Sequence, residues 1–475
     1  MKHLSCLSKG VVGVLTCLLV AVLGVYVFYI LFHAEWLIGD DAFMLRRTAF
    51  GIPFPLSESI MPSVGFFRPF DYLHENIVLL FHSGMHNAFE HYIINAVSFV
   101  LCSGAMAGVL WMTVKPKDVV DFAIVIFGTI LVASRLIGVY INIFGPIFGV
   151  YTYHALALFF LCLFLRNDRV WAMLLSLWCW TYSMLIYENI CIVLGCMGVF
   201  PLLFAYRRLT RKQVIFCFSL IGLALAFVLT YLFVIYLPSL GHRHYDPSHH
   251  TGVGLLENAI SILKGQKFIW VAALVWLWRQ VQLLRKKATY HILYDTLLWT
   301  AGASVAGAVI LRLNWSMYYY DAIILSLPAV VFFVMNASGK YGKYAALCLV
   351  LAFAALHSYR VPASISNNQK ARRTTAFHMN LIAEKAAEGW SVVWYDDEKL
   401  EEADEIQKEF KKETSRNYFQ YLLKDRNWDY DTEIGDRTVV VYPLQNQTPA
   451  FCPKDYERVS FGGISYFILD RNEVQ

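Results

Sequence analysis

Long apolar runs separated by short charged turns dominate the chain up to about residue 360. The first run covers roughly residues 10–33, which exceeds the ~20 residues that cross a bilayer as a helix. It is too long for a signal peptide and lacks a small-residue cleavage site, so we interpret it as a retained anchor. With the runs that follow, about eleven spans are predicted. The later runs are 91–113, 119–134, 146–165, 170–186, 189–206, 213–237, 267–284, 290–311, 320–335 and 343–359.

Basic residues fall in alternate turns between these runs. Those on one side are Lys2, Lys9, Lys115, Lys117, Arg166, Arg169, Arg207, Arg208, Arg211, Lys212, Arg285, Lys286, Lys287, Lys340 and Lys343. The turns on the other side carry far fewer. Because cytoplasmic turns of membrane proteins are enriched in Lys and Arg, this side is predicted to be cytoplasmic. The N-terminus is therefore expected inside and, with an odd number of spans, the C-terminus outside.

The composition favours the same class of protein. Of the 475 residues, 58% are hydrophobic and only 16% are charged, and the mean hydropathy is +0.49. A soluble chain of this length does not need so much apolar surface. The ten cysteines show no metal-type spacing, and only Cys452 falls on the predicted outer side outside the spans, so we expect no disulfide there. The sequence has no glycine-rich phosphate loop and gives no indication of nucleic-acid binding.

The composition changes at about residue 362. Residues 362–475 contain 15 Lys and Arg against 20 Asp and Glu, whereas the preceding part contains 25 against 15. An acidic soluble domain is therefore predicted to follow a basic membrane domain, 1–361. Its pattern predicts helices over 370–389 and 400–424, strands over 391–395 and 438–442, and a closing hairpin around Gly462-Gly463. We expect an α-helical multi-pass membrane protein with a small C-terminal extracytoplasmic α/β domain.

Two further outer segments are long, residues 34–90 and residues 238–266. The first contains aromatic pieces too short to span, which are expected to lie in the membrane interface. The second is rich in histidine, with His242, His244, His249 and His250 around Asp246. Such a cluster is typical of polar or headgroup contacts, and a metal site is the alternative.

The strongest chemical signal is the pair Asp40-Asp41, just beyond the first span. Adjacent carboxylates at a membrane surface repel each other, so a partner must compensate them. Arg46, Arg47 and Arg68 follow in the same loop. This combination indicates a site for a phosphorylated substrate. The alternative is a solvated acidic start to a surface helix.

The acidic pair and four short motifs after it carry a family resemblance. The acidic pair is followed by Gly65-Phe66-Phe67-Arg68-Pro69-Phe70 and by Glu90-His91-Tyr92-Ile93-Ile94-Asn95-Ala96 at the second span; Tyr187-Glu188 and Arg312…Tyr318-Tyr319-Tyr320-Asp321…Leu327-Pro328 come later. In this order, and on a common outer side, they resemble the GT-C superfamily of membrane glycosyltransferases, including its O-antigen glucosyltransferase-like and protein O-mannosyltransferase-like branches. The sequence departs from the family in one place, since the arginine that usually stands beside the late tyrosine is replaced here by another tyrosine.

The resemblance implies an activity. GT-C enzymes transfer a sugar, usually with inversion, from a polyprenyl-phosphate carrier to an acceptor on the non-cytoplasmic side. We therefore expect a hexosyl- or pentosyltransferase that modifies a glycan, a lipid or a protein, such as O-antigen or lipopolysaccharide. The expected location is the bacterial inner membrane, among membrane lipids, with the C-terminal domain in the periplasm.

Roles can be assigned on the same basis. An acceptor hydroxyl is a poor nucleophile and needs a carboxylate to take its proton; Asp40 is the leading candidate, and Asp41 orients the acceptor or takes that role itself. The leaving group is a lipid phosphate, which suits a guanidinium that contacts two oxygens. Arg68 is the first candidate for this clamp, followed by Arg46, Arg47 and Arg312.

A further set of residues is expected to bind the substrates. These are Glu188, His86, His91, Asn95, Tyr151, Tyr153, Trp315, Tyr318 and Tyr320. Glu188 would hydrogen-bond a sugar or an arginine, and the aromatic residues would stack on the sugar or flank the lipid; anchoring in the membrane interface is their alternative. No cofactor is expected to be required. The resemblance adds one alternative, a divalent cation held by Asp40 and Asp41, because part of the superfamily uses such an ion.

Two rival functions share parts of this pattern. A polymerase or ligase of surface glycans would use the same lipid carrier, but typically with loop arginines and a histidine and no acidic pair. A transporter of lipid-linked glycans would need charges inside the membrane, whereas the predicted spans are nearly free of them.

Overall fold

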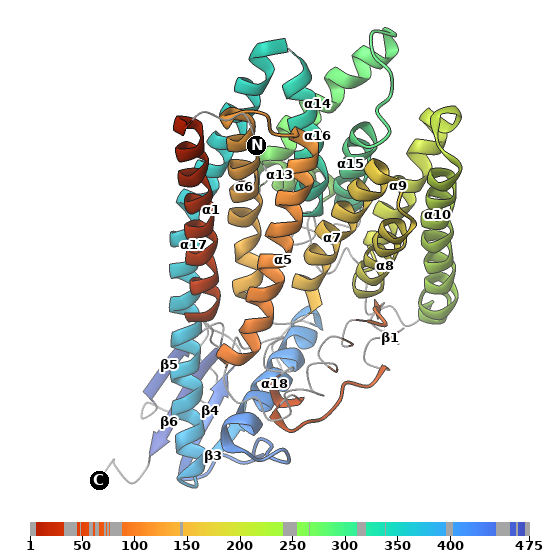
Figure 1. Ribbon diagram of the computed structural model, residues 1–475. Helices are drawn as coiled ribbons and strands as arrows, with labels where there is room; N and C mark the ends of the chain where they lie inside the picture. Colours follow the sequence, from red (N-terminus) through yellow and green to blue (C-terminus); the bar gives the residue numbers. More distant parts are fainter. Residues whose placement is uncertain are drawn as a thin grey trace.

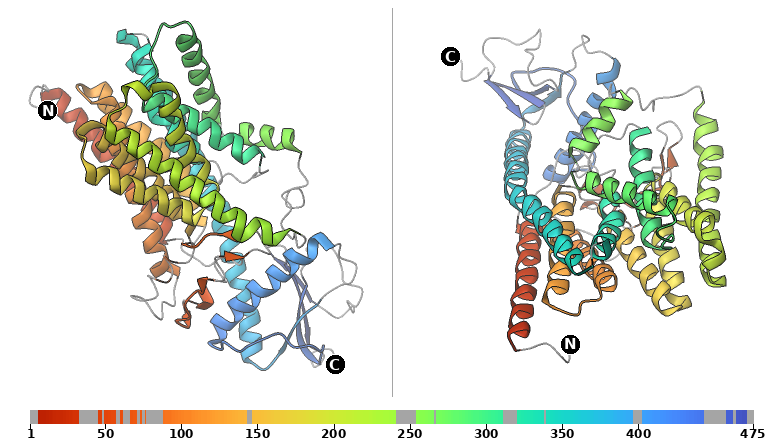
Figure 2. Two further views of the ribbon diagram at one scale, coloured as in Figure 1. Left: turned by 90° about the vertical axis from the view of Figure 1, so that its right-hand side faces the viewer. Right: turned by 90° about the horizontal axis from the view of Figure 1, so that it is seen from above.

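The computed structural model describes residues 6–32, 45–47, 49–56, 60–61, 66–70, 73, 76, 88–142, 146–240, 254–265, 267–310, 320–337, 339–395, 402–442, 457–461 and 464–470. A helical bundle occupies most of the chain, and a small domain with a sheet follows at its end (Figure 1). The start of α1 and the C-terminal domain lie at opposite ends of this bundle (Figures 1 and 2). We call the end that carries the domain the C-domain end.

Apolar helices form the bundle. They are α1 (Cys6–Phe32), α5 (Ala88–Val114), α6 (Val119–Asn142), α7 (Pro146–Asn167), α8 (Val170–Ile186), α9 (Ile190–Ala205), α10 (Arg211–Tyr231), α13 (Leu255–Gly265), α14 (Lys267–Leu284), α15 (Tyr294–Ile310), α16 (Asp321–Ala337) and α17 (Gly342–Ala387). Short turns continue some of them: η1 (Tyr206–Arg208), the π-helix η2 (Leu232–Tyr236), α11 (Leu237–Ser239) and η4 (Gly339–Tyr341).

Within the described residues, seven helices are long and apolar enough to cross a membrane, or eight if the bent pair α13 and α14 counts as one span. The helices α8 and α16 are apolar but shorter. The chain is therefore an integral membrane protein of many passes. The count of about eleven spans stays a prediction.

α6 lies at the centre of the bundle. Within its apolar window 78% of the residues are buried, whereas in α1 only 6% are, so α6 is covered by protein and α1 presents its side chains to lipid. α6 packs against α1, α5 and α17. The hydroxyl of Tyr26 on α1 lies 2.7 Å from that of Ser134 on α6, which lies 2.8 Å from the Ser358 hydroxyl on α17. These hydrogen bonds join α1 to α6 and α6 to α17, and so add directional contacts to the apolar packing of the three helices.

The expectation of nearly charge-free spans is wrong at α14 and α15. Arg279 and Asp295 form an ion pair of 2.8 Å with 7% and 0% of their side chains exposed. Arg279 also donates to the Thr289 carbonyl at 3.1 Å and lies over the Phe333 ring at 4.2 Å. The two charges compensate each other, which is how ionised groups persist in such surroundings. This pair lies at the end of the bundle opposite the C-domain end, next to the basic turn 285–287 (Figure 1).

α6 is also longer than expected. The apolar run was predicted to end at residue 134, yet the helix continues to Asn142. Arg135 therefore lies inside a helix, with its guanidinium carbon 4.9 Å from the centre of the Tyr320 ring. An arginine resembles a helix boundary in the sequence because a charge is costly in lipid. Here the ring of Tyr320, the residue before α16, covers the guanidinium.

The C-terminal domain combines helix and sheet. Strands β3 (Ser391–Trp394), β4 (Arg437–Tyr442), β5 (Glu457–Phe461) and β6 (Ile464–Asp470) form a sheet in the order β3-β4-β6-β5. β3 and β4 are parallel and are connected through α18 (Glu402–Leu423), while β6 is antiparallel to both β4 and β5. The expected α/β unit is confirmed, with a longer first helix.

The first helix of the C-terminal domain is the last part of α17. α17 is a single helix of 46 residues from Gly342 to Ala387. At a rise of ~1.5 Å per residue it spans about 69 Å, more than twice the ~30 Å of a bilayer core. Its last part covers the expected helix 370–389 as far as Ala387, and it passes the expected domain boundary at 361 without a break. The C-terminal domain is thus attached to the bundle by a continuous helix and not by a loose linker.

Candidate functional site

An ion pair at the C-domain end joins two of the predicted site residues. The Arg68 Nε atom lies 3.0 and 2.9 Å from the two carboxylate oxygens of Glu188, which is 120 positions away in the sequence. The guanidinium carbon lies 4.8 Å from the centre of the Tyr187 ring. Side-chain exposure is 18% for Arg68 and 22% for Glu188. The pair is partly shielded from solvent, and the aromatic ring covers one face of the guanidinium.

Local backbone structure explains why Tyr187 and Glu188 project there. α8 ends at Ile186, and Tyr187 adopts an extended conformation with φ −143° and ψ 114°. The helix α9 starts at Ile190. The break between two antiparallel helices therefore presents these two side chains at the C-domain end of the bundle.

The segment that carries Arg68 is attached to the same helices. The strands β1 (Ile60–Met61) and β2 (Phe66–Phe67) pair antiparallel just before it. The backbone N–H of Phe70 donates to the Leu185 carbonyl at 3.1 Å. Phe67 packs on Phe227 with ring centroids 5.4 Å apart, and Phe70 packs on Tyr182 at 5.3 Å. The aromatic residues around Arg68 thus anchor this part of the loop on α8 and α10.

The two other loop arginines have different surroundings. Arg46 donates from Nη2 to the carbonyl oxygen of Arg426 in the C-terminal domain, at 3.2 Å. Burial, partly offset by Glu413, lowers the pKa of the Arg46 guanidinium from its ordinary value. Arg47 donates to the Pro53 carbonyl at 3.1 Å and lies over the Phe54 ring at 5.0 Å. Arg46 therefore connects the first loop to the C-terminal domain. Arg47 makes its contacts within the loop and stabilises the loop conformation.

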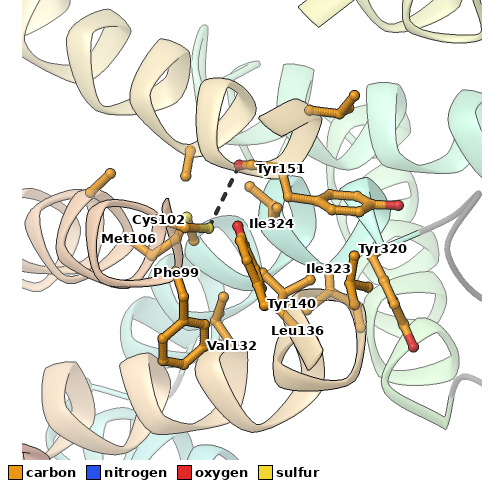
Figure 3. Packing of buried hydrophobic residues seen from close by; sticks show 14 of the residues in the cluster. Phe99, Cys102, Met106, Val132, Leu136, Tyr140, Tyr151, Tyr320, Ile323 and Ile324 are labelled. Atoms are coloured by element: carbon orange, nitrogen blue, oxygen red, sulfur yellow. Dashed lines mark hydrogen bonds between the residues drawn. The ribbon is translucent and has the colours of Figure 1, made fainter. Parts of the chain in front are cut away.

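Aromatic residues line the bundle next to the ion pair. Tyr151 and Tyr320 meet edge to face at 5.8 Å, from α7 and from the residue before α16. Their hydroxyls point away from Phe99 and Cys102 in the buried cluster (Figure 3). Tyr153 packs against Tyr182 at 4.3 Å.

A hydrogen bond places these tyrosines beside the end of α8. The Ser183 hydroxyl on α8 donates to the Val150 carbonyl on α7 at 3.4 Å. Tyr151 follows Val150 directly, and Tyr187 and Glu188 follow α8. The tyrosines and the ion pair therefore belong to adjoining helix ends.

Asn95 lies inside the bundle, and its role in substrate binding stays a prediction. Its side chain is fully buried, and Nδ2 donates to the Tyr140 carbonyl at 2.9 Å. This contact joins α5 to α6. The hydrogen bond from Asn95 to Tyr140 is therefore a contact between two helices of the bundle.

The remaining predicted residues lie outside the described part of the chain. These are Asp40, Asp41, His86, Arg312, Trp315 and Tyr318, while for His91 the structure describes the backbone, within α5. Among the described residues no group of three or more His, Cys, Asp or Glu side chains is arranged to hold a metal ion. The cation option at Asp40 and Asp41 remains a prediction.

Sequence reasoning missed Arg135 as a neighbour of this region. Its contact with Tyr320 joins it to the tyrosine pair. The available signal was a single arginine at the edge of an apolar run, which is a reason to suspect function in a membrane protein.

The overall fold is similar to that of a solved protein structure. The crystal structure of ArnT from Cupriavidus metallidurans bound to undecaprenyl phosphate matches with a TM-score of 0.52 and 11% identity, covering 95% of this chain and 97% of that one. The apo form of the same protein matches at a TM-score of 0.49 with the same identity and coverage. The first of these matches shows that this chain has the same overall fold as ArnT. The sequence itself matches no protein-family model and no curated protein.

Proposed function

We propose that this protein is an inverting glycosyltransferase that moves a sugar from a polyprenyl-phosphate carrier to an acceptor at the C-domain end of the bundle. The main support is the fold likeness to ArnT over 95% of the chain, because that structure holds undecaprenyl phosphate. The Arg68–Glu188 pair and its aromatic neighbours add a polar group at the end of the bundle where the first loop and the C-terminal domain also lie.

The proposed reaction is a single displacement. The acceptor hydroxyl oxygen attacks the anomeric carbon of the donor sugar, and the bond from that carbon to the phosphate oxygen breaks. Its electron pair leaves with the polyprenyl phosphate. Asp40 accepts the hydroxyl proton as the new bond forms. Asp41 orients the acceptor or acts as the base in place of Asp40. Inversion follows because no covalent sugar–enzyme intermediate is formed.

Arg68 serves the leaving group in this mechanism. The growing charge on the phosphate is best met by a guanidinium, which is planar and can contact two oxygens. Glu188 contacts Arg68 through Nε. We assign to Glu188 the task of orienting the guanidinium, so that its terminal nitrogens face the carrier phosphate. Tyr187 limits its rotation by covering one face.

The acceptor class and the location are part of the same proposal. An acceptor on a glycan, a lipid or a protein is reached from the side of the C-terminal domain. With the N-terminus in the cytoplasm, this is the periplasmic side of a bacterial inner membrane. The sugar is a hexose or a pentose.

The test uses carboxamide variants of the acidic pair. Asp40→Asn is expected to lower the rate of sugar transfer by at least ~10²-fold, the usual scale for loss of a general base, while donor binding persists. Asp41→Asn is expected to lower it less. Asp168→Asn is the matched control, because Asp168 pairs with Lys212 at the opposite end of the bundle. Wild-type rates in both single variants and in the double variant would refute this mechanism and favour a glycan polymerase or ligase without an acidic base.

A further inference from the structure

The turn that follows α18 in the C-terminal domain carries an aromatic pair. The ring centroids of Trp428 and Tyr430 are 5.1 Å apart, and both residues are half-buried. The fully buried ring of Phe419 on α18 meets Trp428 edge to face at 5.1 Å. The exposed residues Asn427 and Asp429 alternate with the two rings along the chain. The surface of the turn therefore combines aromatic rings with an amide and a carboxylate.

Hydrogen bonds hold both ends of this turn. At its start, the Asp425 N–H donates to the Gln420 carbonyl at 3.1 Å, and Gln420 Nε2 donates to the Trp428 carbonyl at 2.6 Å. At its end, the Asp431 N–H donates to the Val392 carbonyl of β3 at 2.8 Å. The turn is thus ordered before any ligand binds, which lowers the entropic cost of binding.

The turn lies beyond the membrane interface. The apolar part of α17 ends at Ser366, and from there to Ala387 the helix rises ~32 Å at ~1.5 Å per residue. Val392, which bonds to Asp431, follows that end of the helix (Figure 1). Trp428 is within ~11 Å of Asp431, the reach of the chain between them. Interfacial anchoring, the usual reason for Trp and Tyr on the surface of a membrane protein, does not explain this pair.

The same turn contacts the loop that carries the proposed general base. Arg46 Nη2 donates to the Arg426 carbonyl at 3.2 Å, and Arg426 is separated from Trp428 by a single residue. Arg46 follows Asp41 so closely in the sequence that the chain between them reaches at most ~18 Å. A chain of sugars bound at the turn can therefore extend to the acidic pair.

Two buried side chains beside the pair have a polar atom without a hydrogen-bond partner. These atoms are Gln420 Oε1, an acceptor, and Trp394 Nε1, a donor. Gln420 and Trp394 are 5% and 7% exposed, and the Trp394 ring lies 5.6 Å from that of Tyr430. Such atoms are rare in folded proteins. Ordered water satisfies some of them elsewhere, but water does not explain the aromatic pair on the surface.

We infer that residues 425–430 bind the acceptor of the transfer reaction and that this acceptor is a glycan. The C–H face of a sugar packs on an aromatic ring, whose body is apolar. Sugar hydroxyls donate and accept hydrogen bonds, and so suit the amide of Asn427 and the carboxylate of Asp429. A small movement of the turn lets a hydroxyl reach Gln420 Oε1 and Trp394 Nε1. A lipid acceptor is not favoured, because the turn lies beyond the apolar part of α17.

The test measures binding to the purified full-length protein by isothermal titration calorimetry, with no sugar donor present. One probe is the polysaccharide that mild acid releases from the lipopolysaccharide of the source cells, and the other is the lipid A that remains. The variant Trp428→Ala removes one ring of the pair. The control, Tyr359→Ala, removes an aromatic ring that is 85% exposed on α17. A thermal melt of each variant checks that it folds.

We expect Trp428→Ala to bind the polysaccharide ~10-fold or more weakly, the scale for loss of a tryptophan anchor, and Tyr359→Ala to bind it as the wild type does. Absence of polysaccharide binding to the wild type, an equal loss in the control, or a loss confined to lipid A overturns the inference. If Trp428→Ala does not fold, the exposed Asn427→Ala is used, with an expected loss of ~3-fold for one hydrogen bond; an unchanged affinity then overturns the inference.

The term acceptor rests on the proposed function, whereas the binding itself does not. The two can therefore fail separately. Polysaccharide binding that depends on Trp428, in a protein that consumes no polyprenyl-phosphate sugar, refutes the proposed function and leaves a glycan-binding site. Donor consumption by a protein whose polysaccharide affinity does not depend on Trp428 supports the proposed function and refutes this inference.

Discussion

Coupling between Arg68 and Glu188 is the sharpest prediction about the candidate site. The mechanism assigns Glu188 no contact with the substrate of its own and makes it act through the guanidinium. The variants Arg68→Ala and Glu188→Gln and their combination form a double-mutant cycle that isolates this coupling. Arg68→Lys is the fourth variant, because it keeps the charge but loses the planar group.

The structure limits the contribution of the pair to stability. Both side chains are about one-fifth exposed, and the two short distances involve the same Nε atom and not the two-nitrogen fork that makes arginine pairs strong. After allowance for solvent screening, the pair contributes about 1 kcal/mol to the free energy of unfolding. Each variant should therefore fold, and thermal melts are expected to stay close to the wild type.

The effect on transfer is expected to be larger. Arg68→Ala loses charge-assisted hydrogen bonds to the leaving phosphate, each of ~1.5–3 kcal/mol, and should be ~10-fold to ~10²-fold slower. Arg68→Lys should be clearly impaired, though less so. Glu188→Gln should slow transfer in the wild-type background and have little further effect once Arg68 is alanine.

The assay is the initial rate of sugar transfer from a polyprenyl-phosphate sugar, with a melt recorded for each variant. Additive effects of Arg68→Ala and Glu188→Gln would contradict the positioning role of Glu188. A folded Arg68→Ala variant with the wild-type rate would remove Arg68 from the phosphate clamp altogether, and Arg312 would then be tested.

Three further predictions concern the fold. Reporter fusions after Lys343 and after Gln475 should report opposite sides of the membrane; the same side for both would refute the topology. Arg279→Ala leaves Asp295 buried and uncompensated, so thermal denaturation should show a loss of ~3–5 kcal/mol, and a loss below 1 kcal/mol would contradict the buried pair. Arg46→Ala removes the hydrogen bond to the C-terminal domain, so limited proteolysis of that domain should be faster than in the wild type, and an equal rate would contradict the link.

Most of the fold follows from one-dimensional patterns. The apolar runs from 91–113 to 343–359 coincide with helices because a lipid-exposed backbone must satisfy its hydrogen bonds within the helix. The strands of the C-terminal domain are short apolar runs bounded by polar residues, so their positions were also predictable. The sheet order β3-β4-β6-β5 was not, since it depends on pairing between distant segments.

The errors in the prediction have physical causes. The end of α6 was placed before Arg135 because a charge normally marks a span boundary, and the covering Tyr320 ring comes from a segment far along the chain. α17 was divided near residue 361 because the sequence becomes polar there. A helix outside the membrane needs no apolar run, and the polar stretch continues the same helix.

The candidate site was predictable in composition but not in geometry. Arg68 and Glu188 were each recognised from short motifs. Their pairing across 120 positions is a tertiary contact that neither motif contains. The link from Arg46 to the Arg426 carbonyl is likewise set by the position of the C-terminal domain, which no local pattern determines.

Release of the lipid carrier tests the central claim most directly, because it does not require the acceptor to be known. Purified protein is reconstituted in liposomes with a panel of undecaprenyl-phosphate sugars and a membrane extract as the source of acceptor, and free undecaprenyl phosphate is measured over time. The proposed function predicts that at least one donor of the panel is consumed, and that Asp40→Asn slows its consumption by at least ~10²-fold. Consumption of no donor, or equal consumption by the Asp40→Asn variant, would contradict it.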